Sequence, residues 1–267
     1  MHHFQSRAPV APKKSLGQHF LTDLSVAQRI ADTVDTLPRI PVLEVGPGTG
    51  VLSRFLLPKG RALTAVELDR RSVDYLREHL PELQVVEADF LRMALPEEPF
   101  VLTGNYPYNI SSQIFFKMLE HRDRIPLCTG MVQLEVAQRL ASPPGNKAYG
   151  VLSVMVQAWY DVSLLFVVPH TAFNPPPKVE SAVVSLRRNA RTALPCDESL
   201  FRNVVKTTFQ QRRKMLRVSL RPLLDGAKPQ TDCFDEQLLT RRPETLSVEE
   251  FADLANRLQA QRQATQG

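Results

Sequence analysis

The chain has no long hydrophobic run. Within its 267 residues no apolar stretch approaches the length of roughly 18 residues that a membrane-spanning helix requires, and the N-terminus carries no apolar signal segment. We therefore expect a protein that does not enter a membrane, is not secreted and is located in the cytoplasm.

Cysteine pairs and metal-ligand patterns are also scarce. The three cysteines, Cys128, Cys196 and Cys233, are far apart in the sequence, and none has the spacing of a Cys-x-x-Cys motif. Among the six histidines only His2 and His3 stand close together. We predict no disulfide framework and no metal site, and reduced thiols agree with a cytoplasmic protein.

What the chain does have is a regular alternation of strand-like and helix-like segments. Apolar runs begin near residues 42, 63, 83 and 101, each followed by helical periodicity, and residues 127–133 resemble a fifth strand. This alternation is typical of a doubly wound α/β domain with a mainly parallel sheet. Before it we expect a capped amphipathic helix over residues 23–34, and after it an edge pair of strands over 162–168 and 181–186.

The strand pattern ends near residue 195. Helical periodicity follows over residues 197–209, 212–223 and 247–258, and the last of these helices begins with a capping box from Ser247 to Glu250. We predict a disordered tail (residues 1–12), an α/β domain (13–188) and a small helical domain (189–267).

Positive charge is concentrated around the start of the helical domain. Residues 187–228 contain eleven Lys or Arg and three acidic residues, a local excess of +8, so the rest of the chain carries −3 of the total of +5. Such a concentration indicates a polyanionic partner. The alternative is an ordinary solvated surface.

A glycine-rich turn follows the first expected strand. Residues 42–50 form a buried-type strand that runs into glycines at positions 46, 48 and 50, a turn that lets the backbone approach a ligand closely. The dinucleotide fingerprint needs its third glycine at position 51, which is Val51, so pyrophosphate binding is disfavoured.

Acidic residues end the next two strands. Glu67 stands where an acid hydrogen-bonds the ribose hydroxyls of a bound nucleoside. After the third strand, Asp89 can accept a hydrogen bond from an adenine amino group and Phe90 can pack on the ring. Asp69, which follows Glu67, and Asp89 each have two possible roles, which are binding a ligand and capping a helix. We expect the cap for Asp69 and the ligand role for Asp89, because only Asp89 closes a turn beside the glycines.

The heptapeptide Asn105-Tyr106-Pro107-Tyr108-Asn109-Ile110-Ser111 follows the fourth strand. The side-chain oxygen of Asn105 and a backbone carbonyl of Tyr106 or Pro107 can accept the two hydrogens of an exocyclic amino group, which stabilises positive charge as the nitrogen attacks an electrophilic carbon. Tyr108 would stack on the base, an interaction worth about 1–3 kcal/mol. The alternative is a strand-to-helix turn capped by Asn and stiffened by Pro.

The glycine turn, Glu67, Asp89 and the Asn105 heptapeptide follow successive strands in this order, which resembles the arrangement in S-adenosylmethionine-dependent methyltransferases. Further segments resemble the ribosomal RNA adenine N6-dimethyltransferase family. The similarity spans nearly the whole chain. The segments that carry it are Lys13 to Leu21, the Asn105 heptapeptide, Phe173 to Ser181, Gln211 to Lys214 and Arg242 to Val248.

The resemblance implies a Rossmann-like catalytic domain that uses S-adenosyl-L-methionine, followed by a basic helical RNA-binding domain. The implied reaction is dimethylation of two adjacent adenosines in the 3′-terminal hairpin loop of small-subunit (16S) ribosomal RNA, by a monomer acting on a pre-30S particle. The implied site residues are Gln18, His19, Leu21, Gly46, Gly48, Glu67, Asp89, Phe90 and Asn105 for the cofactor, Asn105, Pro107, Tyr108 and Phe173 for catalysis, and Arg212, Arg213, Lys214 and Arg217 for RNA.

Two positions depart from the family pattern. Tyr106 stands where the family usually has Leu, and we expect it to change the shape of the pocket rather than the mechanism. His19 stands where many members have Asn. It can hydrogen-bond the cofactor's carboxylate, or it is a partly buried histidine without a ligand. For Phe173 the alternative to holding the target base is core packing.

Two other functions stay open. One is a large-subunit ribosomal RNA adenine methyltransferase that confers antibiotic resistance, and the other is a non-catalytic RNA-binding assembly factor. The Arg242 to Val248 segment favours the small-subunit enzyme over the first. Intact Glu67, Asp89, Asn105 and Tyr108 favour catalysis over the second.

Overall fold

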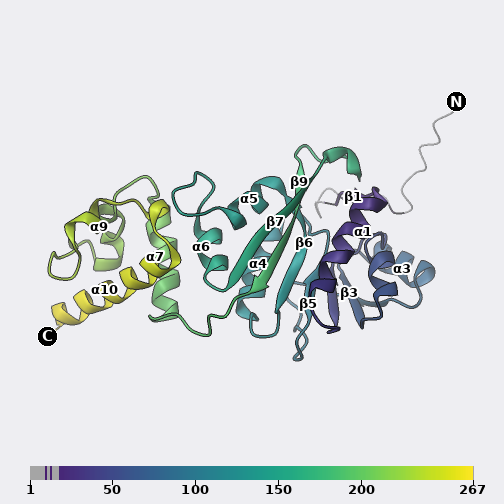
Figure 1. Ribbon diagram of the computed structural model, residues 1–267, viewed down its shortest axis with the longest axis horizontal. Helices are drawn as coiled ribbons and strands as arrows, with labels where there is room; N and C mark the ends of the chain where they lie inside the picture. Colours follow the sequence, from purple (N-terminus) through teal and green to yellow (C-terminus); the bar gives the residue numbers. More distant parts are fainter. Residues whose placement is uncertain (1–9, 11–12, 14–17, 267) are drawn as a thin grey trace. The chain divides into compact units, whose positions relative to one another are not determined.

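The computed structural model describes Val10, Lys13 and residues 18–266, and the chain divides into two compact units (Figure 1). The first unit extends to Ala137 and includes Asp161–Arg188, and the second contains Gln138–Tyr160 and Asn189–Gly267. The chain therefore passes between the units three times. Residues 138–160, which the sequence places with the α/β domain, group with the second unit. The expected tail lies outside the described residues except for Val10.

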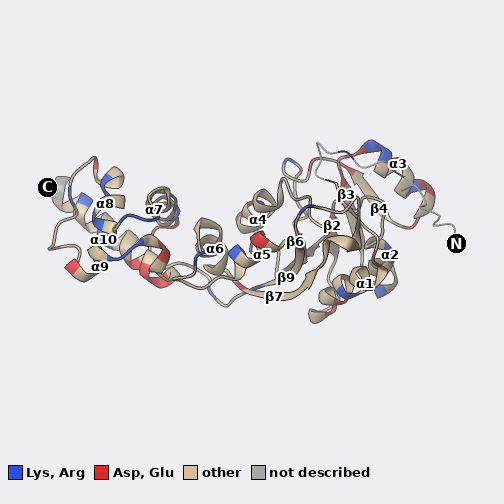
Figure 2. Ribbon diagram, turned by 90° about the horizontal axis from the view of Figure 1, so that it is seen from above, with Lys and Arg blue, Asp and Glu red and all other residues tan. Residues whose placement is uncertain are grey.

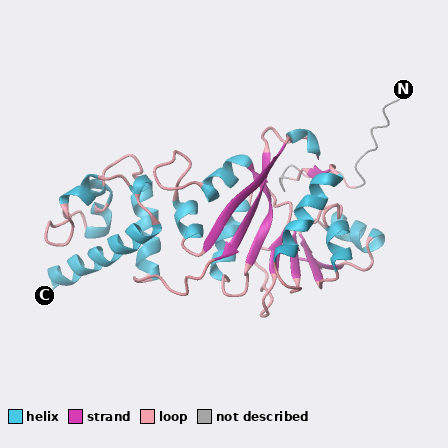
Figure 3. Cartoon of the chain, viewed as in Figure 1, coloured by secondary structure: helices cyan, strands magenta, loops and turns pink. Residues whose placement is uncertain are grey.

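The sheet has seven strands (Figure 3). In spatial order they are β4 (Gln84–Glu87), β3 (Leu63–Glu67), β2 (Val42–Val45), β5 (Val101–Thr103), β6 (Leu127–Gln133), β9 (Ser181–Arg188) and β7 (Tyr160–Val168). The strands from β4 to β6 are all parallel, and β9 runs antiparallel to β6. This confirms the predicted mainly parallel α/β sheet with β9 and β7 paired at its edge. All four residues of β2 are buried, as expected for a strand covered on both faces.

Helices cover both faces of the sheet (Figure 2). The expected first helix is confirmed: Asp23 caps it by accepting hydrogen bonds from the backbone N–H groups of Ser25 and Val26. The apolar stripe of this helix, which includes Ile30, is buried except at Leu24, which is 58% exposed. The helices are α1 (Leu24–Asp32), α2 (Ser53–Leu56), α3 (Arg70–His79), α4 (Ser111–Glu120) and α5 (Leu134–Ala141), with 3-10 helices at Thr33–Thr36 and Leu57–Lys59.

A short second sheet holds the segment that precedes α1. It pairs β1 (Phe20–Leu21) antiparallel with β8 (Phe173–Asn174), which follows a 3-10 helix at His170–Ala172. Strands of two residues have no detectable periodicity, so the sequence does not reveal them. Phe173 is 4% exposed and belongs to the hydrophobic core, which favours the core-packing alternative for this residue.

The second unit is helical. Its helices are α6 (Val151–Gln157), α7 (Glu198–Gln210), α8 (Leu216–Ser219), α9 (Glu236–Thr240) and α10 (Val248–Gln266), with 3-10 helices at Arg221–Leu224 and Pro243–Thr245. The predicted capping box is confirmed, because Glu250 N–H donates to Ser247 Oγ and Ser247 N–H donates to Glu250 Oε2. The predicted helix over residues 212–223 is wrong. The chain turns after Gln211 and forms the single turn of α8, which is followed by the 3-10 helix at Arg221–Leu224. Pro222 lacks the N–H that would continue α8.

Among the helices of the described part of the chain, none is both long enough and apolar enough to cross a membrane.

Candidate active site

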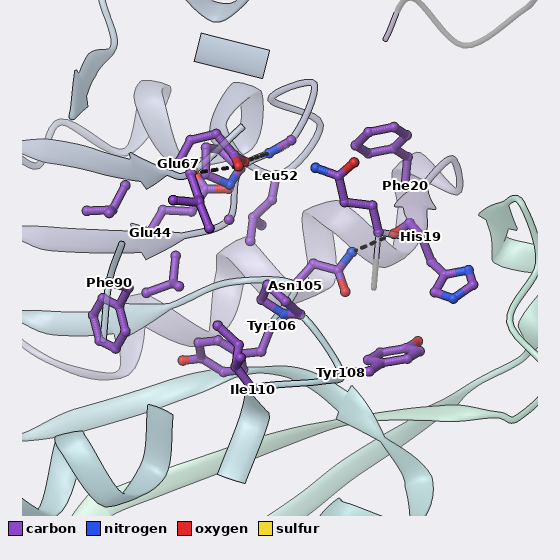
Figure 4. A pocket seen from close by; sticks show the side chains of 18 of the residues that line it. His19, Phe20, Glu44, Leu52, Glu67, Phe90, Asn105, Tyr106, Tyr108 and Ile110 are labelled. Atoms are coloured by element: carbon purple, nitrogen blue, oxygen red, sulfur yellow. Dashed lines mark hydrogen bonds between the residues drawn. The ribbon is translucent and has the colours of Figure 1, made fainter. Parts of the chain in front are cut away.

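A pocket lies at the carboxyl ends of strands β2 to β5 (Figure 4). The turns after these strands line it together with the segment that leads into β1, as the open-sheet rule predicts. It brings together every residue assigned to the cofactor and every residue assigned to catalysis except Phe173. These are Gln18, His19, Leu21, Gly46, Gly48, Glu67, Asp89, Phe90, Asn105, Pro107 and Tyr108.

The glycine turn has the backbone that its sequence requires. Gly46, Gly48 and Gly50 have φ angles of 69°, 58° and 77°, which only glycine adopts without strain. A Cβ atom on residue 48 would lie 2.8 Å from the ring of Phe20, and one on residue 46 would lie 3.3 Å from the ring of Pro107. The missing side chains therefore let the other walls of the pocket approach the turn.

Glu67 accepts hydrogen bonds from backbone N–H groups of the neighbouring turns. Its carboxylate is buried and accepts backbone hydrogen bonds from Gly48 at 3.1 Å, Leu68 at 2.9 Å and Asp69 at 2.8 Å. Burial raises the pKa of Glu67, and the three donors oppose this shift. A carboxylate has about four acceptor positions, so about one remains for a hydroxyl group of a ligand.

A second buried carboxylate, Glu44 of β2, lines the pocket and was not predicted as a site residue. It is 1% exposed and accepts a hydrogen bond of 2.6 Å from Ser53 Oγ. Burial raises the pKa of Glu44 to about 7, and the nearby charge of Glu67 acts in the same direction. The available sequence signal was an acid inside an otherwise apolar strand.

Asp89 and Phe90 occupy a turn rather than a helix start. The carboxylate of Asp89 accepts a hydrogen bond of 2.9 Å from Leu91 N–H, and no helix follows, so the helix-cap alternative is wrong. Lys117 of α4 holds this turn from behind, because its Nζ donates to the carbonyl oxygens of Phe90 and Met93 at 2.7 and 2.5 Å. Lys117 therefore holds the turn in place, and the side chain of Asp89 does not cap a helix.

The amide of Asn105 is oriented by the segment before β1. Its Nδ2 donates to the backbone carbonyl of His19 at 3.1 Å, which leaves Oδ1 as an acceptor (Figure 4). The carbonyl of Pro107 accepts a hydrogen bond from Ile110 N–H at 3.2 Å. Within the described part of the chain, no donor bonds to Asn105 Oδ1 or to the carbonyl of Tyr106. Two neighbouring acceptors are therefore available.

The side chain of Tyr106 is part of the interior. It is 1% exposed, and its hydroxyl donates to the carbonyl oxygen of Thr129 at 2.8 Å. Burial raises the pKa of this hydroxyl well above its ordinary value. Gly130 leaves room for the ring, because a Cβ there would lie 2.8 Å from it. A tyrosine at this position is accommodated in the core.

Tyr108 and His19 fix each other at the margin of the pocket. Their rings stack with centroids 5.5 Å apart and planes inclined by 28°. Nδ1 of His19 donates to the carbonyl oxygen of Pro175 at 2.9 Å, and the hydroxyl of Tyr108 bonds to Ser181 Oγ. Nδ1 of His19 is therefore engaged by a protein group, and Nε2 is the ring nitrogen left for the cofactor's carboxylate.

The lining of the pocket suits a cationic nucleoside. Glu44, Glu67 and Asp89 line it, and none of its described lining residues is Lys or Arg. A sulfonium cofactor carries the positive charge that this environment favours, whereas a pyrophosphate would be repelled. Leu68 and Phe90 add apolar surface for an adenine ring. Among the described residues, no cluster of His, Cys, Asp or Glu side chains is arranged to hold a metal ion.

The basic residues of the second unit fall into two classes. Arg212 is engaged internally, because its Nε lies 2.6 Å from Glu244 Oε2 and its Nη2 donates to the carbonyl of Lys147 at 2.6 Å. Basic positions mark α8 and the segments around it (Figure 2). The exposed candidates for RNA contact are Arg213, Lys214 and Arg217.

Comparison with protein families gives one match over almost the whole chain. The model of the ribosomal RNA adenine dimethylase family matches residues 11–260. The chain is 60% identical over 256 residues to the ribosomal RNA small subunit methyltransferase A of Bacteroides thetaiotaomicron, covering 94% of this chain and 95% of that protein. The protein of the same name from Phocaeicola vulgatus is 56% identical over 257 residues, covering 94% of this chain and 91% of that protein.

Solved structures with the same fold include a dimethyladenosine transferase and a 23S rRNA methyltransferase. A dimethyladenosine transferase from Plasmodium falciparum superposes with a TM-score of 0.75 and 25% identity, covering 88% of this chain and 96% of that one. The 23S rRNA methyltransferase ErmE superposes with a TM-score of 0.69 and 32% identity, covering 90% of this chain and 99% of that one. The expected Rossmann-like methyltransferase fold is confirmed.

Proposed function

Since the chain belongs to the ribosomal RNA adenine dimethylase family, we propose that it dimethylates N6 of adenosine in small-subunit ribosomal RNA. The protein is a methyltransferase, and its cofactor is S-adenosyl-L-methionine. The observation that carries the proposal is the pair of available acceptors at Asn105 and Tyr106, beside a nucleoside pocket lined by carboxylates.

The proposed chemistry asks little of the protein in proton transfer. When bound, the cofactor supplies an electrophilic methyl carbon together with its leaving group, so catalysis by the chain consists of orientation and electrostatic stabilisation. Asn105 Oδ1 and the Tyr106 carbonyl accept the two N6 hydrogens and stabilise the positive charge that develops on nitrogen. Tyr106 is preferred over Pro107, because the carbonyl of Pro107 already accepts the Ile110 N–H.

A second methylation of the same nitrogen has less support from hydrogen bonds. The monomethyl product retains one hydrogen, so only one of the two acceptors stays engaged. The second transfer then depends more on the position of the base against the ring of Tyr108, which His19 and Ser181 hold in place. Stacking on an aromatic ring is worth about 1–3 kcal/mol per base.

The target adenosine must leave its stack to reach the pocket. Unstacking costs a few kcal/mol and costs least for loop bases, which favours two adjacent adenosines in the 3′-terminal hairpin loop as the substrate. Arg213, Lys214 and Arg217 are proposed to contact RNA phosphates. Action on a pre-30S particle, a monomeric state and a cytoplasmic location stay predictions from the sequence.

The large-subunit alternative retains some support. ErmE, named as a 23S rRNA methyltransferase, is 32% identical to this chain. The relatives named as small subunit methyltransferases reach 60% identity over nearly their full length, so the small-subunit substrate is preferred.

Mapping of the modified bases tests the proposal. The protein is incubated with labelled cofactor and with unmethylated small or large ribosomal subunits, and the labelled nucleotides are located by mass spectrometry. We expect dimethyladenosine at two adjacent positions of the small-subunit hairpin loop. Label confined to large-subunit RNA would support the resistance-type activity, and no label in either RNA would support a non-catalytic factor.

A further inference from the structure

A network of charged and polar side chains lies beside the pocket, and of its members only Gln18 has been assigned to the cofactor. Its centre is the carboxylate of Asp69, which is 0% exposed. Lys13 Nζ donates to Oδ1 at 2.9 Å, and Arg71 Nη2 donates to Oδ2 at 2.8 Å. Gln18 Nε2 lies 3.5 Å from Oδ2. We call Asp69, Lys13, Gln18 and Arg71 the Asp69 network.

Capping of α3 does not account for this network. As expected from the sequence, Asp69 is the N-cap of α3 and accepts a hydrogen bond from Arg71 N–H at 3.3 Å. A cap requires only such local bonds, and exposed Asp residues serve as caps elsewhere in the chain, as Asp197 does for α7. Lys13 and Gln18 come from a segment more than 50 residues away in the sequence.

The network joins that segment to the cofactor pocket at two points. Gln18 lines the pocket, and it is bonded to Lys13 twice: Lys13 N–H donates to Gln18 Oε1 at 2.8 Å, and Gln18 N–H donates to the Lys13 carbonyl at 3.4 Å. On the other side, Asp69 N–H donates to Glu67 Oε1 at 2.8 Å. Asp69 thus connects the N-terminal wall of the pocket, through its carboxylate, to Glu67, through its backbone N–H.

The chain beyond Gln18 is held by other means. The pairing of β1 with β8 fixes residues 20 and 21, and the carbonyl of His19 bonds to Asn105. Loss of the Asp69 network would therefore release Lys13 and Gln18 while the orientation of Asn105 stays supported. Effects on cofactor binding and on the chemical step are therefore separable. Gln18 lines the pocket for the cofactor, whereas Asn105 acts in the chemical step.

We propose that Asp69 is a positioning residue for cofactor binding, which acts by holding Gln18 in the lining of the pocket, directly and through Lys13. The hydrogen bonds from Arg71 and then from Lys13 keep the pKa of Asp69 well below its ordinary value, so the carboxylate is charged at any pH at which the enzyme works. The inference rests on the identity of the cofactor and holds whichever ribosomal RNA is methylated.

The first test compares Asp69→Asn with Asp74→Asn. Asparagine is also a good N-cap, so the first variant keeps the helix start and removes the charge. Asp74 lies on the same helix, is 59% exposed and pairs only at 3.6 Å with Arg70, so its replacement controls for the charge change. For Asp69→Asn we expect calorimetry with S-adenosyl-L-methionine to show about tenfold weaker binding, within the range of coupling for contacting ionic residues. The control should bind as the wild type does.

Two further readouts separate positioning from general stability. In the protein without cofactor, trypsin should cleave after Lys13 faster in Asp69→Asn than in Asp74→Asn. The KM for cofactor should rise in Asp69→Asn, and its kcat at saturating cofactor should stay near that of the wild type. Equal cofactor affinity and equal cleavage in the two variants would overturn the proposal.

A Lys13→Ala variant covers the case in which Asp69→Asn does not fold. The side chain of Lys13 is 45% exposed, so its removal leaves the core intact. We expect about threefold weaker cofactor binding in Lys13→Ala, because Lys13 is one of several donors to Asp69. Where Asp69→Asn folds, the double variant should bind about as weakly as Asp69→Asn alone, because the ion pair between the two residues is already broken in either single variant. Wild-type affinity in Lys13→Ala, or fully additive effects in the double variant, would contradict the proposal.

Discussion

The first unit, which holds the pocket (the pocket unit), and the second unit (the C-terminal unit) place the charges of their candidate functional residues in opposite ways. In the pocket unit the carboxylates of Glu44, Glu67 and Asp69 are no more than 6% exposed by residue, and each is bonded to donors from neighbouring turns or segments. In the C-terminal unit Arg213 and Lys214 lie in solvent. The first arrangement suits a small ligand held in one geometry, and the second suits a long polyanion that can be bound in several registers.

This difference has an energetic consequence. A buried carboxylate loses its hydration and is sensitive to the removal of any partner, so single substitutions in the pocket unit should have large and specific effects. Exposed cations are screened by salt and act together, so their effects should be small, cumulative and dependent on ionic strength. Four predictions test this comparison.

The largest effect is expected for Asn105→Ala in the pocket unit. Removing one acceptor for the developing charge should slow single-turnover methyl transfer by about 10²–10³-fold, as when one group of a preorganised electrostatic site is removed. Gln113→Ala, which removes an exposed amide on α4 outside the pocket lining, is the matched control. A decrease of only a few fold in Asn105→Ala would show that the backbone carbonyl of Tyr106 suffices.

A large pH effect is expected at Glu44. The pKa of Glu44 is about 7 in the folded protein, against an ordinary value of 4.5. Between these two pH values Glu44 is mostly protonated in the folded protein and mostly ionised in the unfolded protein. The free energy of unfolding should therefore fall as pH rises through this window, by up to about 3 kcal/mol at 1.36 kcal/mol per pKa unit. Glu44→Gln should remove this dependence, so its stability relative to the wild type should be higher at pH 8 than at pH 5.

Denaturant unfolding without cofactor measures this effect. Glu78→Gln, whose side chain is 78% exposed, is the control and should follow the wild type at both pH values. Parallel pH profiles for Glu44→Gln and the wild type would mean that Glu44 does not titrate in this range, and the contrast between the two units would be weaker than proposed.

A smaller effect is expected for Glu67→Ala on cofactor binding. Removal of a hydrogen bond to a charged group costs about 1.5–3 kcal/mol, which calorimetry with S-adenosyl-L-methionine would register as weaker binding. Glu87→Ala is the matched control, because Glu87 lies directly beside Glu67 in the parallel register but is a more exposed residue. RNA affinity should be the same in both variants. Unchanged cofactor affinity in a folded Glu67→Ala would remove Glu67 from the site.

The smallest effect per residue is expected in the C-terminal unit. Replacing Arg213, Lys214 and Arg217 by Ala should reduce the slope of log affinity for RNA against log salt by about 0.7–0.9 for each phosphate that the protein no longer neutralises. Arg212→Ala should instead lower the melting temperature, because it breaks the pair with Glu244. An unchanged salt slope in the triple variant would show that these residues are merely solvated.

Local sequence determined much of this molecule. The alternation of apolar runs and helical periodicity predicted the order of the sheet strands along the chain, and the glycines predicted a turn that only glycine can form without strain. The pocket also follows from local information, because parallel strands bring their carboxyl ends to one edge. Glu67, Asp89 and Asn105 therefore meet in the pocket as the strand pattern requires.

Tertiary structure alone decided the contacts between distant segments. No local pattern links Lys13 to Asp69, Lys117 to the turn after β4 or His19 to Asn105, since each pair is separated by more than 20 residues and is joined by packing. The same holds for Arg212, which looks like its exposed neighbours in sequence but bonds to Glu244. Local preferences act over a few residues, whereas the partner of a charged side chain depends on which segments the completed core brings together.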